Sequence, residues 1–178
     1  MRRFALRAAI GTLSLLTVVA AGGCSEPVDG KSVEEPATEI AFHPCDGFSP
    51  EALAAAKIDA ASPDRMPDRE DPPNHACGFL SRDPYYVAVV SAIGAPFTGI
   101  KSDDRFAVLS ETEIGGRRAL VSDFRGGSAC TVSVAIEPGI LEFMIGYSEL
   151  EDFTTVEAAC DQATKVATTL APYFPDHL

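Results

Sequence analysis

Two matching His-x-Cys pairs are the residues best suited to chemistry in this sequence: His43 with Cys45, and His75 with Cys77. Two imidazoles and two thiolates are the right donors for a tetrahedral Zn²⁺ site. Structural zinc sites, however, usually contain two cysteines separated by about two to four residues, and this sequence has no such pair. Oxidation to disulfides would also remove the thiolates that a metal needs. The sequence therefore favours disulfides, and we expect neither a bound metal nor a cofactor.

A serine nucleophile has weaker support. Gly126-Gly127-Ser128-Ala129 partly resembles the Gly-x-Ser-x-Gly nucleophile elbow, but Cys130 stands where the second glycine is required. A turn between two strands explains the same residues, so we expect no Ser-His-acid triad.

Charged clusters offer further candidate sites. Oxygen-rich clusters attract Ca²⁺, but the acidic residues here lack EF-hand spacing, and solvated acidic loops are the simpler interpretation. Three arginines near predicted turns are candidates for contact with an anionic partner, although surface solubility explains them equally. The acidic clusters are Asp64, Asp68, Glu70 and Asp71, followed by Asp103 and Asp104, and the arginines are Arg117, Arg118 and Arg125.

Paired carboxylates provide the main enzymatic alternative. Glu149 together with Glu151 or Asp152 would give a cell-wall-active hydrolase its acid and base. These residues precede a predicted helix, where acids are favoured for a structural reason, because they face the positive end of the helix dipole.

The N-terminus has the layout of an export signal. Arg2, Arg3 and Arg7 precede an uncharged apolar stretch over 8–20, which is too short to span a bilayer as a helix. Small residues then lead directly into Cys24, an arrangement that resembles a bacterial lipobox. We expect residues 1–23 to be a lipoprotein signal peptide and Cys24 to carry the lipid. The sequence leaves open whether export uses the general or the twin-arginine route.

The five cysteines agree with export to an oxidising compartment. Lipidation of Cys24 leaves four, which can form two disulfides in three connectivities. Cys45–Cys77 and Cys130–Cys160 are favoured because they close sequential loops, but the sequence does not decide between the three.

Elements of secondary structure follow from caps and periodicity. Ser49-Pro50-Glu51 predicts the start of a short helix that runs to Ile58. A capping box at Thr154 and Glu157 predicts a longer helix that Pro172 ends, and Cys160 lies on its apolar face. Strands are predicted over 76–81, 85–93, 119–124, 130–136 and 140–147; the strand at 85–93 is rich in Val and Tyr, and the one at 130–136 shows period-two alternation. The segment 61–74 is interpreted as an exposed loop, and 106–109 is ambiguous.

These elements predict an α+β fold, with an antiparallel sheet of about five strands packed by a short N-terminal and a longer C-terminal helix. The acid-rich segment 24–41 is expected to be a flexible tether, and 42–178 a single domain. The formal net charge of −12 argues against a nucleic-acid-binding protein, which needs a basic face.

Several of these features together resemble a known family. They are the lipobox, the four-cysteine frame and the segments 42–46, 77–79, 114–119, 130–134 and 159–163. The sequence is similar to actinobacterial lipoproteins of domain-of-unknown-function family 3558. The resemblance implies an envelope lipoprotein with two disulfides, and it transfers no catalytic residue.

The leading functional hypothesis is a non-enzymatic lipoprotein on the extracytoplasmic face of the cell membrane. Its domain would bind a protein partner, or a small apolar ligand between the sheet and the helices. The alternatives are the hydrolase described above and a sensor-like or accessory subunit.

Overall fold

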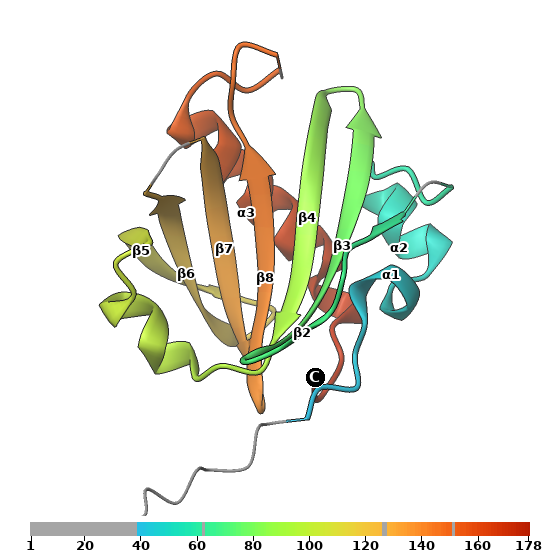
Figure 1. The fold of residues 1–178 in the computed structure, drawn as a ribbon. Coiled ribbons are helices and arrows are strands. Elements are labelled where there is room, and N and C mark those ends of the chain that lie inside the picture. Colours follow the sequence, from blue (N-terminus) through green and yellow to red (C-terminus); the bar gives the residue numbers. More distant parts are fainter. Residues whose placement is uncertain (1–38, 62, 126–127, 151) are drawn as a thin grey trace, which may run out of the picture. The chain divides into compact units, whose positions relative to one another are not determined.

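The computed structural model describes residues 39–61, 63–125, 128–150 and 152–178 (Figure 1). The predicted signal peptide, Cys24 and most of the predicted tether lie outside the described residues. No helix in the described ranges is long and apolar enough to cross a membrane.

One eight-stranded antiparallel sheet forms the centre of the domain. Its strand order is β1-β3-β4-β8-β7-β6-β5, with β2 paired to β3. The strands are β1 (Asp64–Arg65), β2 (Arg69–Glu70), β3 (Pro73–Arg82), β4 (Tyr85–Ile93), β5 (Phe106–Ile114), β6 (Arg117–Phe124), β7 (Ala129–Ile136) and β8 (Gly139–Gly146). The helices are α1 (Pro44–Gly47), α2 (Pro50–Ala55) and α3 (Val156–Leu170), with 3₁₀ helices η1 (Phe97–Ser102) and η2 (Ala171–Tyr173).

The α+β class and the antiparallel sheet agree with the sequence, but the expected number of strands was too low. The segment 61–74 is not only a loop, because it contributes β1, β2 and the start of β3. The ambiguous stretch 106–109 begins β5, a full strand of nine residues at the sheet edge. Most side chains of β1, β2 and β5 are exposed, so burial imposes no apolar pattern on the sequence of these strands.

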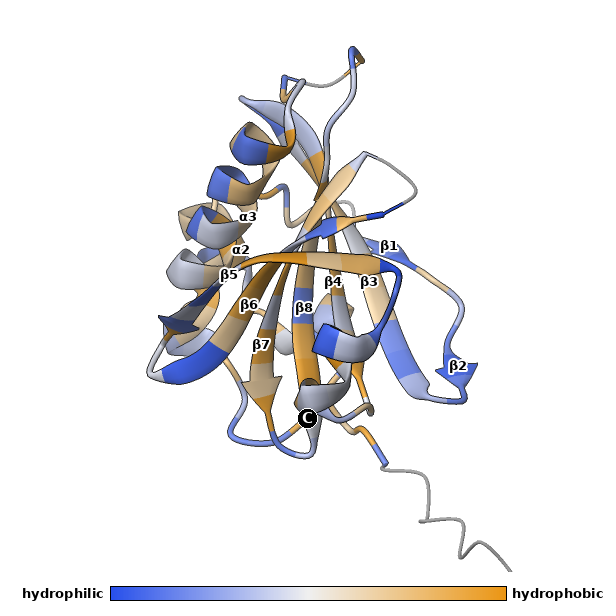
Figure 2. Ribbon diagram, turned by 90° about the vertical axis from the view of Figure 1, so that its left-hand side faces the viewer, coloured by the Kyte–Doolittle hydropathy of each residue, from blue (hydrophilic) through white to orange (hydrophobic). Residues whose placement is uncertain are grey.

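The long helix α3 packs along one face of the sheet (Figures 1 and 2). Thr155, not Thr154, caps it, and its side chain accepts a hydrogen bond from the Ala158 N–H at 3.3 Å. Its apolar stripe belongs to the same core cluster as large buried side chains on the sheet, among them Phe79, Tyr86, Phe143 and Ile145. The interface between helix and sheet is therefore filled by side chains along most of its length.

The N-terminal helices extend this core at the β3 side of the sheet (Figure 1). Ser49 caps α2, as its sequence predicts, by accepting a hydrogen bond from the Ala52 N–H. Ile40 is already buried in the core, two residues before the expected domain start, and Leu178 is buried at the other end of the chain. Among the described residues, the packed core therefore includes side chains from Ile40 to Leu178.

The four frame cysteines form Cys45–Cys77 and Cys130–Cys160, the pairing that the sequence favours. The first disulfide joins α1 to β3, and the second joins β7 to α3. Each therefore connects a helix to the central sheet.

The opposite face of the sheet has a small second cluster. Ile100 of η1 packs there on Leu120 and Ile140, which point away from α3. The same face buries a row of polar side chains on adjacent strands, namely Ser91, Glu142 and Ser133. Polar side chains at these central positions are unusual, because burying a polar group costs free energy unless the group is hydrogen-bonded.

Candidate functional site

The Cys45–Cys77 disulfide brings the two histidines of the His-x-Cys pairs together. Each histidine lies two residues before its cysteine, and the two cysteine Cα atoms are 5.3 Å apart. The rings of His43 and His75 are stacked, with centroids 5.3 Å apart and an interplanar angle of 28°. The repeated spacing in the sequence thus becomes a pair of facing imidazoles.

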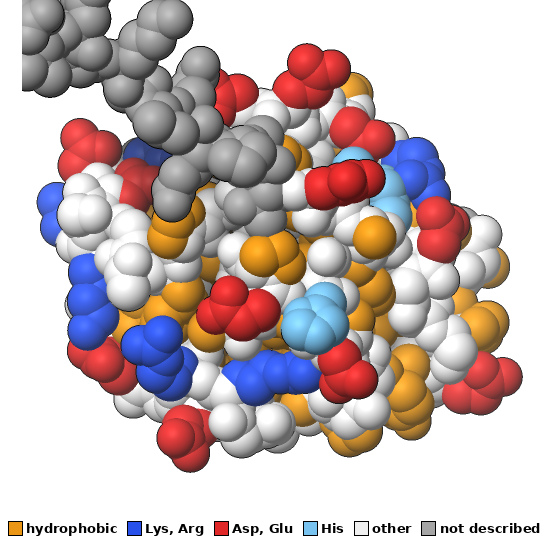
Figure 3. Space-filling view, turned by 90° about the horizontal axis from the view of Figure 1, so that it is seen from below, with side chains coloured by type: hydrophobic (Ala, Val, Ile, Leu, Met, Phe, Trp, Pro, Cys, Tyr) orange, Lys and Arg blue, Asp and Glu red, His pale blue; other side chains and the backbone are white. Residues whose placement is uncertain are grey.

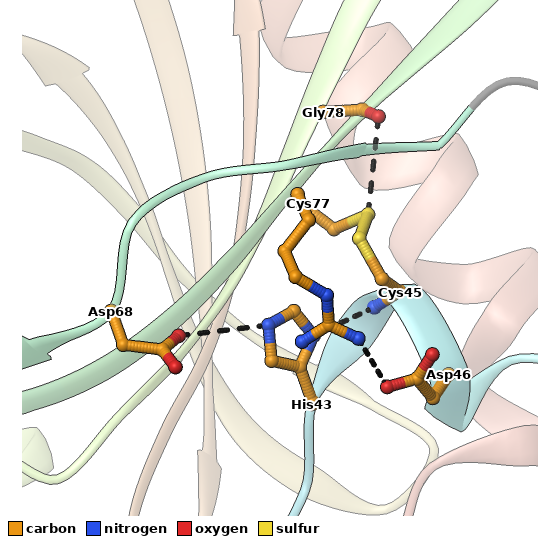
Figure 4. Close-up of a disulfide and its surroundings, with 7 residues drawn as sticks. His43, Cys45, Asp46, Asp68, Cys77 and Gly78 are labelled. Carbon is orange, nitrogen blue, oxygen red and sulfur yellow. Dashed lines mark hydrogen bonds and ion pairs between the residues drawn. A yellow bond between two sulfur atoms is a disulfide. The ribbon is translucent and has the colours of Figure 1, made fainter.

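His43 is held as part of the α1 cap. Its Nδ1 accepts a hydrogen bond from the Cys45 N–H at 3.1 Å, so in the neutral ring the proton is on Nε2 (Figure 4). That Nε2 is buried, has no hydrogen-bond partner and lies 3.6 Å from Oδ1 of Asp68. Burial, together with the nearby Arg65 guanidinium, lowers the pKa of His43 and so favours the neutral ring.

His75 faces an acceptor at each ring nitrogen. Nε2 lies 3.2 Å from the Ile40 carbonyl oxygen, and Nδ1 lies 2.8 Å from Oδ1 of Asp68. A neutral imidazole carries one N–H and can donate to only one of these two acceptors, whereas the doubly protonated ring can donate to both. The hydrogen bond with His75 lowers the pKa of Asp68, so this carboxylate is ionised.

The three side chains form a compact set of donors. The ligand atoms of His43, Asp68 and His75 all lie within 4.8 Å of one another. Arg65 forms an ion pair with Asp46. The His-x-Cys pairs therefore supply two nitrogens to this cluster, whereas their sulfurs are joined in the disulfide.

Asp68 was recognised in the sequence only as one acid of a solvated loop. Asp68 lies beside the histidines because β1 and β2 pair with β3, and no spacing of residues in the sequence predicts that pairing. His43, Asp68 and His75 are the residues that sequence reasoning did not combine.

Glu142 is a second titratable group that sequence reasoning missed. It is 7% exposed, and its carboxyl accepts a hydrogen bond from the Ser133 hydroxyl at 3.1 Å. Burial raises its pKa, because desolvation penalises the charged form. The available signal was a lone acid within the apolar run of residues 140–147.

The other predicted candidates do not converge on one site. Asp103 forms an ion pair with Arg105, so its carboxylate is already neutralised by a neighbouring side chain. Arg117 donates to the Pro175 carbonyl, and Arg118 lies over the Phe97 ring. Figure 3 shows acidic, basic and histidine side chains interspersed on one end of the molecule, without a continuous basic patch.

The proposed hydrolase acids have different surroundings. Asp152 accepts a hydrogen bond from the Tyr85 N–H at 2.6 Å, and its own N–H donates to the Tyr85 carbonyl. This carboxylate therefore holds the loop after β8 against β4. Glu149 is exposed, and Glu151 lies outside the described residues.

A groove of about 370 Å³ separates the edge strand β5 from α3. Leu109, Ser110 and Thr112 form its strand side, whereas Val156, Glu157, Asp161 and Thr164 form its helix side. Val121 and Cys160 complete its lining. A second hollow, of about 620 Å³, lies between η1 and strands β5 and β6, where Lys101 and Glu111 pair across it.

Comparison with known proteins identifies the family. The family described as "Protein of unknown function (DUF3558)" matches residues 19–173. The chain belongs to DUF3558. Among curated proteins and solved structures, none matches this DUF3558 protein. The matched range includes both disulfides, the histidine–aspartate cluster, Glu142 and all of α3.

Proposed function

We propose that this DUF3558 protein is a lipid-anchored protein of the cell envelope whose domain binds a protein partner without catalysing a reaction. The lipobox-like residues before Cys24 support export and anchoring. The observation that carries the binding function is the free edge of β5.

The two edges of the sheet are very different. At one edge, β1 and β2 are only two residues long, and short edge strands limit pairing with other chains. At the other edge, β5 has nine residues and pairs only with β6 in the described part of the chain. A long edge strand offers unpaired backbone donors and acceptors to an incoming extended segment.

The groove beside β5 adds side-chain recognition to this edge. Leu109 is 54% exposed and contributes to the groove next to β5, where a partner's apolar side chain would be received. Glu157 and Asp161 are its charged lining residues, and no lysine or arginine lines it. We therefore expect the partner segment to be extended, partly apolar, and neutral or basic.

Site-specific photo-crosslinking in intact envelopes tests this function. A crosslinking side chain at Leu109 is expected to capture one predominant protein, whereas the same group at Tyr85 is not. Tyr85 is a matched control because it is 48% exposed but lies on β4. Identical adducts at both positions, or none at Leu109, would contradict binding at the β5 edge.

Two further variants separate the remaining parts of the proposal. Cys24→Ala is expected to release the protein from membranes, and retention of this variant would contradict the lipid anchor. Peptidoglycan digestion by the native protein but not by Glu149→Gln would replace the binding function with the hydrolase alternative.

A further inference from the structure

We propose that His43, Asp68 and His75 form a binding site for a divalent transition-metal ion of the Zn²⁺ type. The proposal rests on the convergence of three donor atoms from three separate parts of the chain. His43 precedes α1, Asp68 precedes β2, and His75 lies in β3. Two imidazole nitrogens and one carboxylate oxygen are donors that suit zinc and its neighbours better than Mg²⁺ or Ca²⁺.

His75 already has the arrangement of a metal-binding histidine. Its Nε2–H donates to the Ile40 carbonyl at 3.2 Å, and such a bond to a backbone carbonyl commonly orients the ring of a metal ligand. A metal ion on Nδ1 would occupy the place of the proton shared with Asp68, 2.8 Å away. Binding would then release that proton, and the metal would bridge the two donors.

His43 supplies the second nitrogen. Its Nε2 is buried without a hydrogen-bond partner and faces Oδ1 of Asp68 at 3.6 Å. Binding through Nε2 moves the ring proton to Nδ1, which displaces the hydrogen bond from the Cys45 N–H. The cap can be given up because α1 has only four residues and its position is also fixed by the Cys45–Cys77 disulfide. We therefore expect micromolar rather than nanomolar affinity.

The surroundings leave room for the ion's remaining ligands. The Asp68 side chain is 54% exposed, so water or a ligand group can complete the coordination from the solvent side. Arg65, whose charge acts on His43, is paired with Asp46, which offsets its repulsion of an incoming ion. Because binding requires two neutral imidazoles, affinity is expected to fall as the pH is lowered from 7.5 to 5.5.

Titration of the full chain with Zn²⁺ alone tests the site. The protein is purified in detergent, oxidised and without a polyhistidine tag, and binding is followed by calorimetry and by the absorption bands of Co²⁺. We expect one ion per chain in the native protein. His43→Asn and Asp68→Asn are each expected to weaken binding at least tenfold. Asn is a good helix cap, so His43→Asn removes the ligand while preserving the cap of α1.

His177→Ala is the matched control, because it removes an exposed histidine in the C-terminal segment. It is expected to bind Zn²⁺ like the native protein. The absence of saturable one-to-one binding in the native protein would overturn the proposal. So would unchanged affinity in Asp68→Asn, which alters an exposed side chain and leaves the core intact.

Discussion

Removal of the Cys130–Cys160 disulfide provides a quantitative test of how the domain is held together. This disulfide closes a loop with a sequence separation of 30 and connects α3 to β7 across the core. The loop-entropy relation gives about 3.6 kcal/mol for a loop of this length. Small domains have a total unfolding free energy of roughly 5–15 kcal/mol, so this one bond is a large part of it.

The double variant Cys130→Ala/Cys160→Ala is therefore expected to lose about 3.6 kcal/mol of unfolding free energy, with a further loss from the sulfur atoms removed from the core. In thermal terms this is a fall in Tm on the order of 10–15 °C. Urea unfolding followed by circular dichroism measures the change directly, provided that the slope of free energy against urea is the same in both proteins.

Cys45→Ala/Cys77→Ala is the matched comparison. Its loop has a sequence separation of 32, so loop entropy assigns it about the same loss. Similar losses in the two variants would support the entropic reasoning. A loss below about 1 kcal/mol in a folded Cys130→Ala/Cys160→Ala variant would refute it, because packing alone would then suffice to hold α3.

Three further changes test individual features. Burial raises the pKa of Glu142, so native stability should decline above pH 4.5 by up to about 1.4 kcal/mol per pH unit, and Glu142→Gln should remove this decline in urea titrations. The lowered pKa of His43 acts in the opposite sense: its contribution to stability is present above pH 6.5 and lost as the pH falls, and His43→Asn should abolish that loss. An added Cβ at Gly139 would lie 2.0 Å from the Ile93 carbonyl oxygen, so Gly139→Ala should lower the unfolding free energy by about 1–3 kcal/mol or more. Gly99→Ala should not lower it through such a clash, because a Cβ there would have no neighbour within 4 Å. An unchanged pH dependence of stability in Glu142→Gln or His43→Asn would contradict the reasoning about that residue, as would equal unfolding free energies for Gly139→Ala and Gly99→Ala.

The sequence predicts the elements whose side chains face the core. Strand β7 alternates Val132, Val134 and Ile136 with Thr131 and Ser133, and α3 carries an apolar stripe, because one side of each packs in the main core. The exposed strands β1 and β2 have no such pattern, and they form because β3 is long enough to pair with them. The shift of the helix cap from Thr154 to Thr155 reflects two adjacent residues with equal capping ability.

The sequence indicates the two histidines of the candidate site but not its aspartate. The repeated His-x-Cys spacing singles out His43 and His75, and pairing of the sulfurs then places the two rings face to face. Asp68 joins them through the path of the chain between β1 and β3, a tertiary feature without a local signature. Glu142 is visible in the sequence as an acid among apolar residues, but its burial depends on the neighbouring strands β4 and β7.

The two disulfides lie one after the other along the chain, and neither loop encloses the other. Every alternative pairing of the same four cysteines would need loops longer than both native ones. Since closing a longer loop costs more entropy, random oxidation of the unfolded chain already favours the native pairs. Mispaired forms should therefore be a minority during oxidative folding, and the domain should mature with little dependence on a disulfide isomerase.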